Sequence, residues 1–133
     1  MAKEFMYMGK TLQELQQMSP QEFAKIATSR TRRSINRGLD KNTSDKMMRA
    51  HQQIQSGHHL AKPIRTHLRH FVILPQMVGL KIAVYKGNTF EPIDIQPEMI
   101  GHLLGEYVLT RKRVAHGKAG IGSTKSSTAI TAK

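Results

Sequence analysis

The stretch Leu80–Ile95, "LKIAVYKGNTFEPIDI", contains the clearest structural signal in the chain. In its first half, inward-facing apolar residues alternate with outward-facing residues at a period of two, which predicts a half-buried strand. The inward positions of that strand are Leu80, Ile82 and Val84. Lys86–Thr89 has turn chemistry, because glycine and asparagine tolerate positive φ. Phe90, Ile93 and Ile95 begin a returning strand in which Pro92 indicates a sheet edge, so we predict a β-hairpin.

Two similar phrases flank this hairpin: "PQMVGLKI" begins at Pro75 and "PEMIGHLL" begins at Pro97. The first runs into a strand, whereas the second opens with a proline and an acid, as the first turn of a helix often does. We therefore expect different structures, a turn before the hairpin and a short helix after it. That helix ends at Gly105, and its inward residues are Met99, Leu103 and Leu104. A true tandem repeat is the less favoured alternative, since repeat arrays need about three stacked copies or more.

The first third of the chain has helical signals. Capping boxes at Thr11–Glu14 and Ser19–Glu22 each place a hydroxyl and a carboxylate where they can satisfy the free amides of a helix start. After the second box the helical pattern runs without a break to Arg37, and Gly38 stops it. The apolar face of this helix begins with Phe23, Ile26 and Ala27.

A second long helix is predicted over residues 43–56, capped by Asn42 or Thr43 and ended by Gly57. Its apolar stripe is thin and consists of Met47, Ala50 and Ile54. A helix with so narrow an apolar face needs a neighbour to lie against.

The chain is strongly basic, with 21 Lys and Arg against nine Asp and Glu in 133 residues, a formal charge of +12. Such a charge repels itself unless a polyanion neutralises it, and nucleic acid is the expected partner. Residues 30–70 hold ten Lys and Arg against two acids, residues 71–110 hold two against four, and residues 111–133 hold six against none. A nearly neutral core between two basic regions is typical of nucleic-acid-binding proteins. The bland alternative is a solvated basic face.

The kind of nucleic acid is suggested by what the sequence lacks. No zinc-finger spacing, basic zipper or aromatic RNA-recognition signature is present. We expect most of the seven Phe and Tyr residues to lie in the core, which leaves few rings for base stacking. The sequence therefore favours recognition of a folded RNA through phosphates and shape. The alternative is a DNA-binding or chromatin-like basic protein.

Metal and cofactor sites are not predicted. The chain has no cysteine, which excludes disulfides and thiolate-bound zinc and fits a reducing compartment. The pair His67 and His70 and the adjacent His58 and His59 lack a further ligand at matching spacing. Phosphate or other polar contacts are the expected role of these histidines.

An enzyme is not predicted either. Asp94, Glu98 and Glu106 could in principle perform acid–base work or hold Mg²⁺, but no nucleophile–base pair accompanies them. The glycine-rich stretch 117–127, "GKAGIGSTKSS", lacks the spacing of a phosphate-binding loop.

A membrane role is not expected. No apolar run of about 18 residues exists, and the first ten residues lack the apolar core of a secretory signal. The basic helix has too thin an apolar face to lie in a bilayer surface.

Four blocks carry a resemblance: "PQMVG" at Pro75–Gly79, "YKG" at Tyr85–Gly87, "MIGHLLGEY" at Met99–Tyr107, and Thr110-Arg111. In this order they resemble the small-subunit ribosomal protein nineteen family, over residues 64 to about 117. The N-terminal stretches "SRTRRSINRGL" and "SDKMMRAHQQ" resemble its archaeal and eukaryotic branch. The chain departs from the pattern at Gln76, where an acid is frequent, and at Leu80, where His is common.

The resemblance implies an α+β fold in which N-terminal helices pack on a three-stranded, mostly antiparallel sheet. It adds a short C-terminal helix and a basic tail that is disordered when free. Three segments follow: a helical extension (1–60), an α+β core domain (61–110) and the tail (111–133). The implied function is a structural, non-catalytic constituent of the cytoplasmic small ribosomal subunit, bound to the 3′ head domain of its rRNA. The implied neighbours are ribosomal protein thirteen of the same subunit and, near the tail, tRNA.

The residues expected to contact RNA come from two arguments. The charge argument alone gives a helical stripe at i, i+3 and i+7 and one neighbour, namely Arg30, Arg33, Arg37 and Arg32. The resemblance implies contacts from the first strand, the hairpin tip, the short helix and the tail. These residues are Arg65, Arg69 and His70, then Lys86 and Asn88, then His102, then Arg111, Lys112, Arg113 and His116. Lys118, in the basic tail, is expected to bind RNA as well. For His102 a structural role is the alternative.

Overall fold

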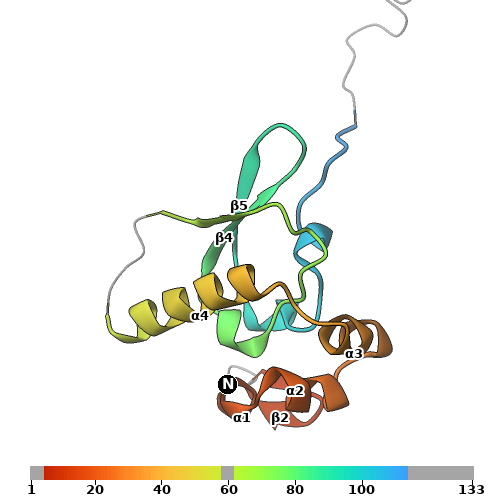
Figure 1. Cartoon of the computed structure of the whole chain (residues 1–133), viewed down its shortest axis with the longest axis vertical. Helices are drawn as coiled ribbons and strands as arrows, with labels where there is room; N and C mark the ends of the chain where they lie inside the picture. Colours follow the sequence, from red (N-terminus) through yellow and green to blue (C-terminus); the bar gives the residue numbers. More distant parts are fainter. Residues whose placement is uncertain (1–4, 58–61, 114–133) are drawn as a thin grey trace, which may run out of the picture.

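The computed structural model describes residues 5–57 and 62–113 (Figure 1). These residues form four α-helices and five strands, which confirms the α+β class. The helices are α1 (Leu12–Gln17), α2 (Pro20–Ile26), α3 (Ser29–Asn36) and α4 (Lys41–Gln55). The strands are β1 (Met6–Tyr7), β2 (Lys10–Thr11), β3 (Ile64–Thr66), β4 (Lys81–Tyr85) and β5 (Phe90–Asp94). In Figure 1 the hairpin β4–β5 projects at one end of the molecule, and α1 and α2 lie at the other.

The main sheet has the expected number of strands, three, and their order is β3-β4-β5. The hairpin β4–β5 is antiparallel, and its turn closes through a hydrogen bond from the amide of Lys86 to the carbonyl of Thr89 (3.0 Å). Strand β3, however, pairs parallel to β4, so the expectation of a mostly antiparallel sheet is wrong for one of the two pairings. A long crossover, residues 67–80, brings the chain back to start β4 in the direction of β3.

A second, two-stranded sheet was not foreseen. Strands β1 and β2 are antiparallel neighbours joined by Met8 and Gly9, both of which have positive φ (50° and 78°). Positive φ at both central residues is the requirement of the tight turn that matches strand twist. The small hairpin directs Tyr7 toward Phe23, with ring centroids 5.8 Å apart.

Both predicted capping boxes are present. At α1 the amide of Thr11 donates to the Glu14 carboxylate (3.1 Å), and at α2 the amide of Ser19 donates to Glu22 (2.9 Å). The Ser19 backbone and then the Ser19 hydroxyl lower the pKa of Glu22, because both donate to its ionised form. The residues within one turn of the chain thus determine both helix starts.

The predicted continuous helix from Phe23 to Arg37 is wrong. Ala27 and Thr28 are extended (ψ 162° and 158°), and they separate α2 from α3. The break re-aims α3 so that the buried hydroxyl of Thr31 donates to the carbonyl of Gly101 (2.6 Å). A partner 70 residues away therefore outweighs a locally acceptable helical pattern.

Helix α4 begins two residues earlier than predicted. The carboxylate of Asp40, not Asn42 or Thr43, caps it by accepting from the amide of Thr43 (2.8 Å). Of the expected apolar stripe, Met47 and Ala50 are buried, whereas Ile54 is 37% exposed.

The two similar phrases adopt the same local structure, contrary to expectation. Each forms a one-turn 3-10 helix, η1 (Pro75–Met77) and η2 (Pro97–Met99). Each then ends in a glycine at nearly equal positive φ, 86° at Gly79 and 84° at Gly101. The predicted C-terminal α-helix is therefore absent from the described residues. Gly105 does not end a helix but lies within a separate 3-10 turn, η3 (Leu104–Glu106).

The two phrases also bond to each other's flanks in the same way. The amide of Gly79 donates to the carbonyl of Ile95, and that of Gly101 donates to Ile73 (2.9 and 3.0 Å). In return the amide of Ile95 donates to Leu80, and that of Ile73 to His102 (3.0 and 2.8 Å). Residues 73–80 and 95–102 are thus related by a local two-fold symmetry. They are the two halves of one long hairpin, and each half contains one 3-10 turn.

One hydrophobic cluster joins the helices to the sheet. Leu15 and Phe23 from the helices, and Ile82 and Val84 from β4, are at most 1% exposed. Each such side chain contributes roughly 1.5–3 kcal/mol through burial. Helices α1 and α4 pack against η1, α4 also against β3, and α2 against α3. The helices thus contact the crossover and one sheet edge more than a sheet face.

Candidate nucleic-acid interface

The four predicted arginines of the N-terminal region gather on and beside α3. Thr31 and Ile35 are the buried side of the helix, at 2% and 7% exposure. The arginines lie on the other side and are all exposed; they are Arg30, Arg32, Arg33 and Arg37. The break before α3 therefore has a consequence for charge, because it turns the basic side of the helix outward.

Three of these arginines line a hollow of about 540 Å³, the α3 groove. Its walls are Arg30, Arg33 and Arg37 from one stripe, with Ser34, Gly38, His70 and Leu103. The predicted spacing of the stripe is thus confirmed, and the fold adds His70 from the crossover. His70 itself is exposed and lies in the turn after β3, not on the strand as expected.

The α3 arginines are not neutralised by acids of the described residues. Three ion pairs occur within ranges 5–57 and 62–113, and none includes an α3 arginine. Arg32 makes a long contact with the Ser29 hydroxyl (3.4 Å). A planar guanidinium that is exposed and lacks a carboxylate partner is suited to bind phosphate through two parallel hydrogen bonds.

Arg69 lies in a different setting from the one expected of an RNA-contacting residue. It is half-buried, in the turn after β3, not on that strand. Its guanidinium donates to three backbone carbonyls, those of Tyr85 (2.8 Å), Gly105 (3.0 Å) and Val108 (2.6 Å). The three bonds connect the crossover, the hairpin and the start of the C-terminal segment.

The hairpin residues differ in how free their charge is. Arg65 is exposed on β3, with its guanidinium carbon 5.5 Å from the centre of the Phe90 ring. Lys86 is paired with Glu91 (3.2 Å), so its charge is partly neutralised. Asn88 is exposed at the hairpin tip, where its side chain is open to a partner.

His102 is held by Glu106 through its Nδ1 (2.8 Å) and lies edge-on to Tyr107. Burial, and then the charge of Glu106, raise the pKa of Tyr107 above its ordinary value, because both disfavour the ionised form. Both residues are exposed enough to meet a ligand as well.

The first residues of the predicted basic tail are exposed and leave the body of the domain beside the hairpin (Figure 1). They are Arg111, Lys112 and Arg113. His116 and Lys118, with the rest of the tail, lie outside the described residues, as do His58 and His59.

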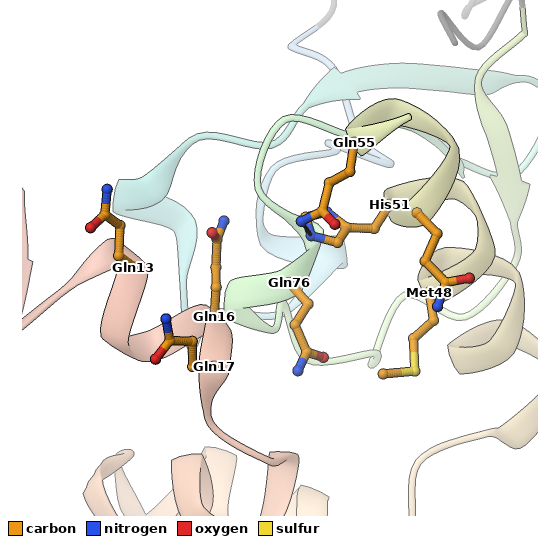
Figure 2. Close-up of a pocket in the computed structure, with 8 residues that line it drawn as sticks. Gln13, Gln16, Gln17, Met48, His51, Gln55 and Gln76 are labelled. Atoms are coloured by element: carbon orange, nitrogen blue, oxygen red, sulfur yellow. Dashed lines mark hydrogen bonds between the residues drawn. The ribbon is translucent and has the colours of Figure 1, made fainter. Parts of the chain in front are cut away.

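A second hollow, of about 460 Å³, has no counterpart in the sequence reasoning (Figure 2). Its walls contain no Lys, Arg, Asp or Glu. They are glutamines of α1, α4 and η1 with two other side chains, namely Gln13, Gln16, Gln17, Gln52, Gln55, Gln76, Met48 and His51. The side-chain amide of Gln76 donates to the carbonyl of Met18 (3.1 Å). An ionised carboxylate, the group expected here from the family resemblance, has no proton to donate. A hollow without cations offers phosphate little, so the candidate interface is the basic side of the molecule.

Among the described residues, no group of three or more His, Asp or Glu side chains is placed to hold a metal ion. Asp94 pairs with Lys81 (3.3 Å) and Glu106 with His102 (2.8 Å), so each of these carboxylates already has a partner. None of the described helices has the length and apolarity that a bilayer span requires.

The comparisons with known proteins agree with this picture. The family model for ribosomal protein S19 matches residues 33–116. Small ribosomal subunit protein uS19 from two strains of Halobacterium salinarum is 47% identical over 130 residues, which cover 98% of this chain and 92% of the relative. The family model begins at residue 33, within the arginine-rich α3, whereas the match to these relatives also includes the part of α3 before that residue. With its fold, its basic groove and this extent of similarity, the chain belongs to the ribosomal protein S19 family.

Proposed function

We propose that this protein binds the 3′ head domain of small-subunit rRNA through phosphate and shape contacts, with the α3 groove as a principal site. As a member of its family, the protein is a structural constituent of the small subunit in the cytoplasmic ribosome, and it is not an enzyme. The observation that carries the proposal is the convergence of three exposed arginines and His70 on one hollow without a carboxylate partner among the described residues.

Further contacts are proposed outside the α3 groove. Arg65 and Asn88 would meet RNA at the hairpin, and Arg111–Arg113 where the chain leaves the domain. His102 and Lys86 would contribute through hydrogen bonds, since each is already paired with a glutamate. We also propose ribosomal protein thirteen of the small subunit as a neighbour, with the tail directed toward the tRNA sites.

The groove can be tested with a charge-matched pair of triple variants. Arg30→Gln, Arg33→Gln and Arg37→Gln together remove three charges from the groove, and the control removes three exposed charges from α4: Lys41→Gln, Lys46→Gln and Arg49→Gln. Binding to a transcript of the rRNA 3′ domain is measured over a range of salt. Because each contacted phosphate releases counterions, the groove variant should lower the log–log salt slope by about two to three, and the control by less than about one.

Equal slopes for the two triple variants would contradict the groove assignment, since net charge alone would then explain the binding. A preference for duplex DNA over the rRNA transcript would contradict the proposed partner, and it would favour the DNA-binding alternative.

A further inference from the structure

The outer face of the sheet carries side chains that the hydrophobic cluster does not include. Cross-strand partners project to the same face, so the register Arg65↔Ala83↔Pro92 and Tyr85↔Phe90 defines one face. The opposite face presents Ile82 and Val84 to the core. Neither Tyr85 nor Phe90 belongs to the core cluster, and both are half-exposed.

The expectation that most aromatic side chains lie in the core holds for four of the seven Phe and Tyr residues, all of which are described. Phe23 and Phe71 are buried, and Phe5 and Tyr7 are partly buried against the core cluster. The other three, Tyr85, Phe90 and Tyr107, lie outside that cluster. The alternation at a period of two predicts the outward position of Tyr85, because it places this side chain opposite to that of Val84, on the side away from the core.

Three rings and one guanidinium meet at the hairpin end of this outer face. The ring centroids of His67 lie 4.5 Å from Tyr85 and 5.0 Å from Phe90, and Tyr85 lies 5.1 Å from Phe90. Arg65 caps the group from β3, 5.5 Å above the Phe90 ring. His67 and Arg65 are exposed, and the hairpin projects away from the helices (Figure 1).

Two contacts in the turn hold the cluster in place. The Tyr85 hydroxyl donates to the carbonyl of Gly87 in the turn, which fixes the ring against the strand end. The Lys86–Glu91 ion pair closes the other side of the turn. Rings held by their neighbours lose little entropy when a flat ligand stacks on them.

We propose that His67, Tyr85, Phe90 and Arg65 form a platform on which an unpaired RNA base stacks. Bases stack on aromatic rings and on guanidinium planes in single-stranded or bulged RNA, while a paired helix hides those faces. The exposed cation Arg65 suits an adjoining phosphate, which a nucleotide carries next to its base. The inference deepens the proposed function, on which it rests, by naming an unpaired nucleotide as the ligand of this face.

Tyrosine fluorescence provides a local readout, because the chain has three tyrosines and no tryptophan. In the full-length variant Tyr7→Phe/Tyr107→Phe, the remaining emission comes from Tyr85. The probes are a single-stranded oligoadenylate of about six nucleotides and a blunt RNA duplex. We expect the oligoadenylate to quench Tyr85 emission as it saturates and the duplex to leave it unchanged.

Affinity variants separate stacking from charge. Tyr85→Leu/Phe90→Leu should weaken oligoadenylate binding by about 5-fold or more, with an unchanged salt slope, since stacking contributes roughly 1–3 kcal/mol per base. The matched control Tyr85→Phe keeps the ring and should bind as the parent does. Arg65→Lys keeps the charge but loses the plane, and it should weaken binding without touching the hairpin, whatever the double variant does to folding.

Two results would overturn the platform and leave rRNA binding intact. One is salt-dependent binding of oligoadenylate that leaves Tyr85 emission unchanged. The other is binding of oligoadenylate with equal affinity by the parent and by Arg65→Lys. If neither the oligoadenylate nor the rRNA transcript binds, the proposed function itself fails.

Discussion

Arg69 offers a sharp test of the difference between a basic residue that binds RNA and one that holds the fold. Its guanidinium is half-buried and donates to the carbonyls of Tyr85, Gly105 and Val108 at 2.6–3.0 Å. The backbone of Arg69 takes part as well, since its carbonyl accepts from the amide of Gly105 (2.7 Å). Even a Cβ at Gly105 would lie 2.9 Å from that carbonyl, so the chain is closely packed here.

Replacing Arg69 by Met removes the three donors and keeps most of the apolar stem. A hydrogen bond to a charged group contributes roughly 1.5–3 kcal/mol, but water can reach part of this site, so we take about 1 kcal/mol for each bond. The expected loss is about 3 kcal/mol of unfolding free energy. Arg69→Lys, whose ammonium cannot reach all three carbonyls at once, should lose about 1–2 kcal/mol.

Urea unfolding followed by circular dichroism measures this loss as a shift of the midpoint at constant slope. Arg65→Met is the matched control, an exposed arginine four positions earlier whose loss should cost less than about 1 kcal/mol. The position that matters less for stability should matter more for RNA binding. Arg65→Met should lower the salt slope of binding, and Arg69→Lys should leave it nearly unchanged. If Arg69→Met were nearly neutral for stability yet lowered the salt slope by about one, the structural role would be refuted.

Two further predictions concern the repeated turns and the start of α4. Gly79→Ala and Gly101→Ala both place Cβ at positive φ, at roughly 1–2 kcal/mol each, but only the second Cβ meets the Tyr7 hydroxyl (2.8 Å). Gly101→Ala should thus lose about 1 kcal/mol more in urea unfolding, and Tyr7→Phe should abolish that difference; an unchanged difference would contradict the clash. Donation from the Thr43 side chain and then its backbone lowers the pKa of Asp40, so its contribution to stability is present above the ordinary pKa near 3.8 and is lost as the pH falls through the folded value. Asp40→Asn should show a smaller fall of the urea midpoint between about pH 5 and pH 3 than the parent, and an equal fall would assign the acid sensitivity elsewhere.

The features that the sequence predicted well are those decided within a few residues. Capping boxes at Thr11 and Ser19 depend on contacts three residues apart, and the hairpin depends on alternation and a short turn. The arginine stripe followed from helix period alone, so it survived even though the helix that carries it is shorter than expected.

The errors arise where distant partners decide. Nothing near Thr28 in the sequence signals that α3 must turn so that Thr31 can reach Gly101. No residue near Arg69 indicates that its guanidinium is half-buried, because its three carbonyl acceptors lie 16 to 39 residues away. The parallel pairing of β3 is equally invisible, since it depends on where the crossover returns.

The matching 3-10 turns of the long hairpin bear on how the chain finds its fold. Pairing at the hairpin tip brings Leu80 next to Ile95, and completion of both 3-10 turns then brings Ile73 next to His102. The inner contact shortens the loop that the outer contact must close. The entropic cost of loop closure is therefore divided into several small steps. Pairing in the C-terminal half can start at the hairpin tip and extend away from it. The helices can then pack against a surface that is already largely formed.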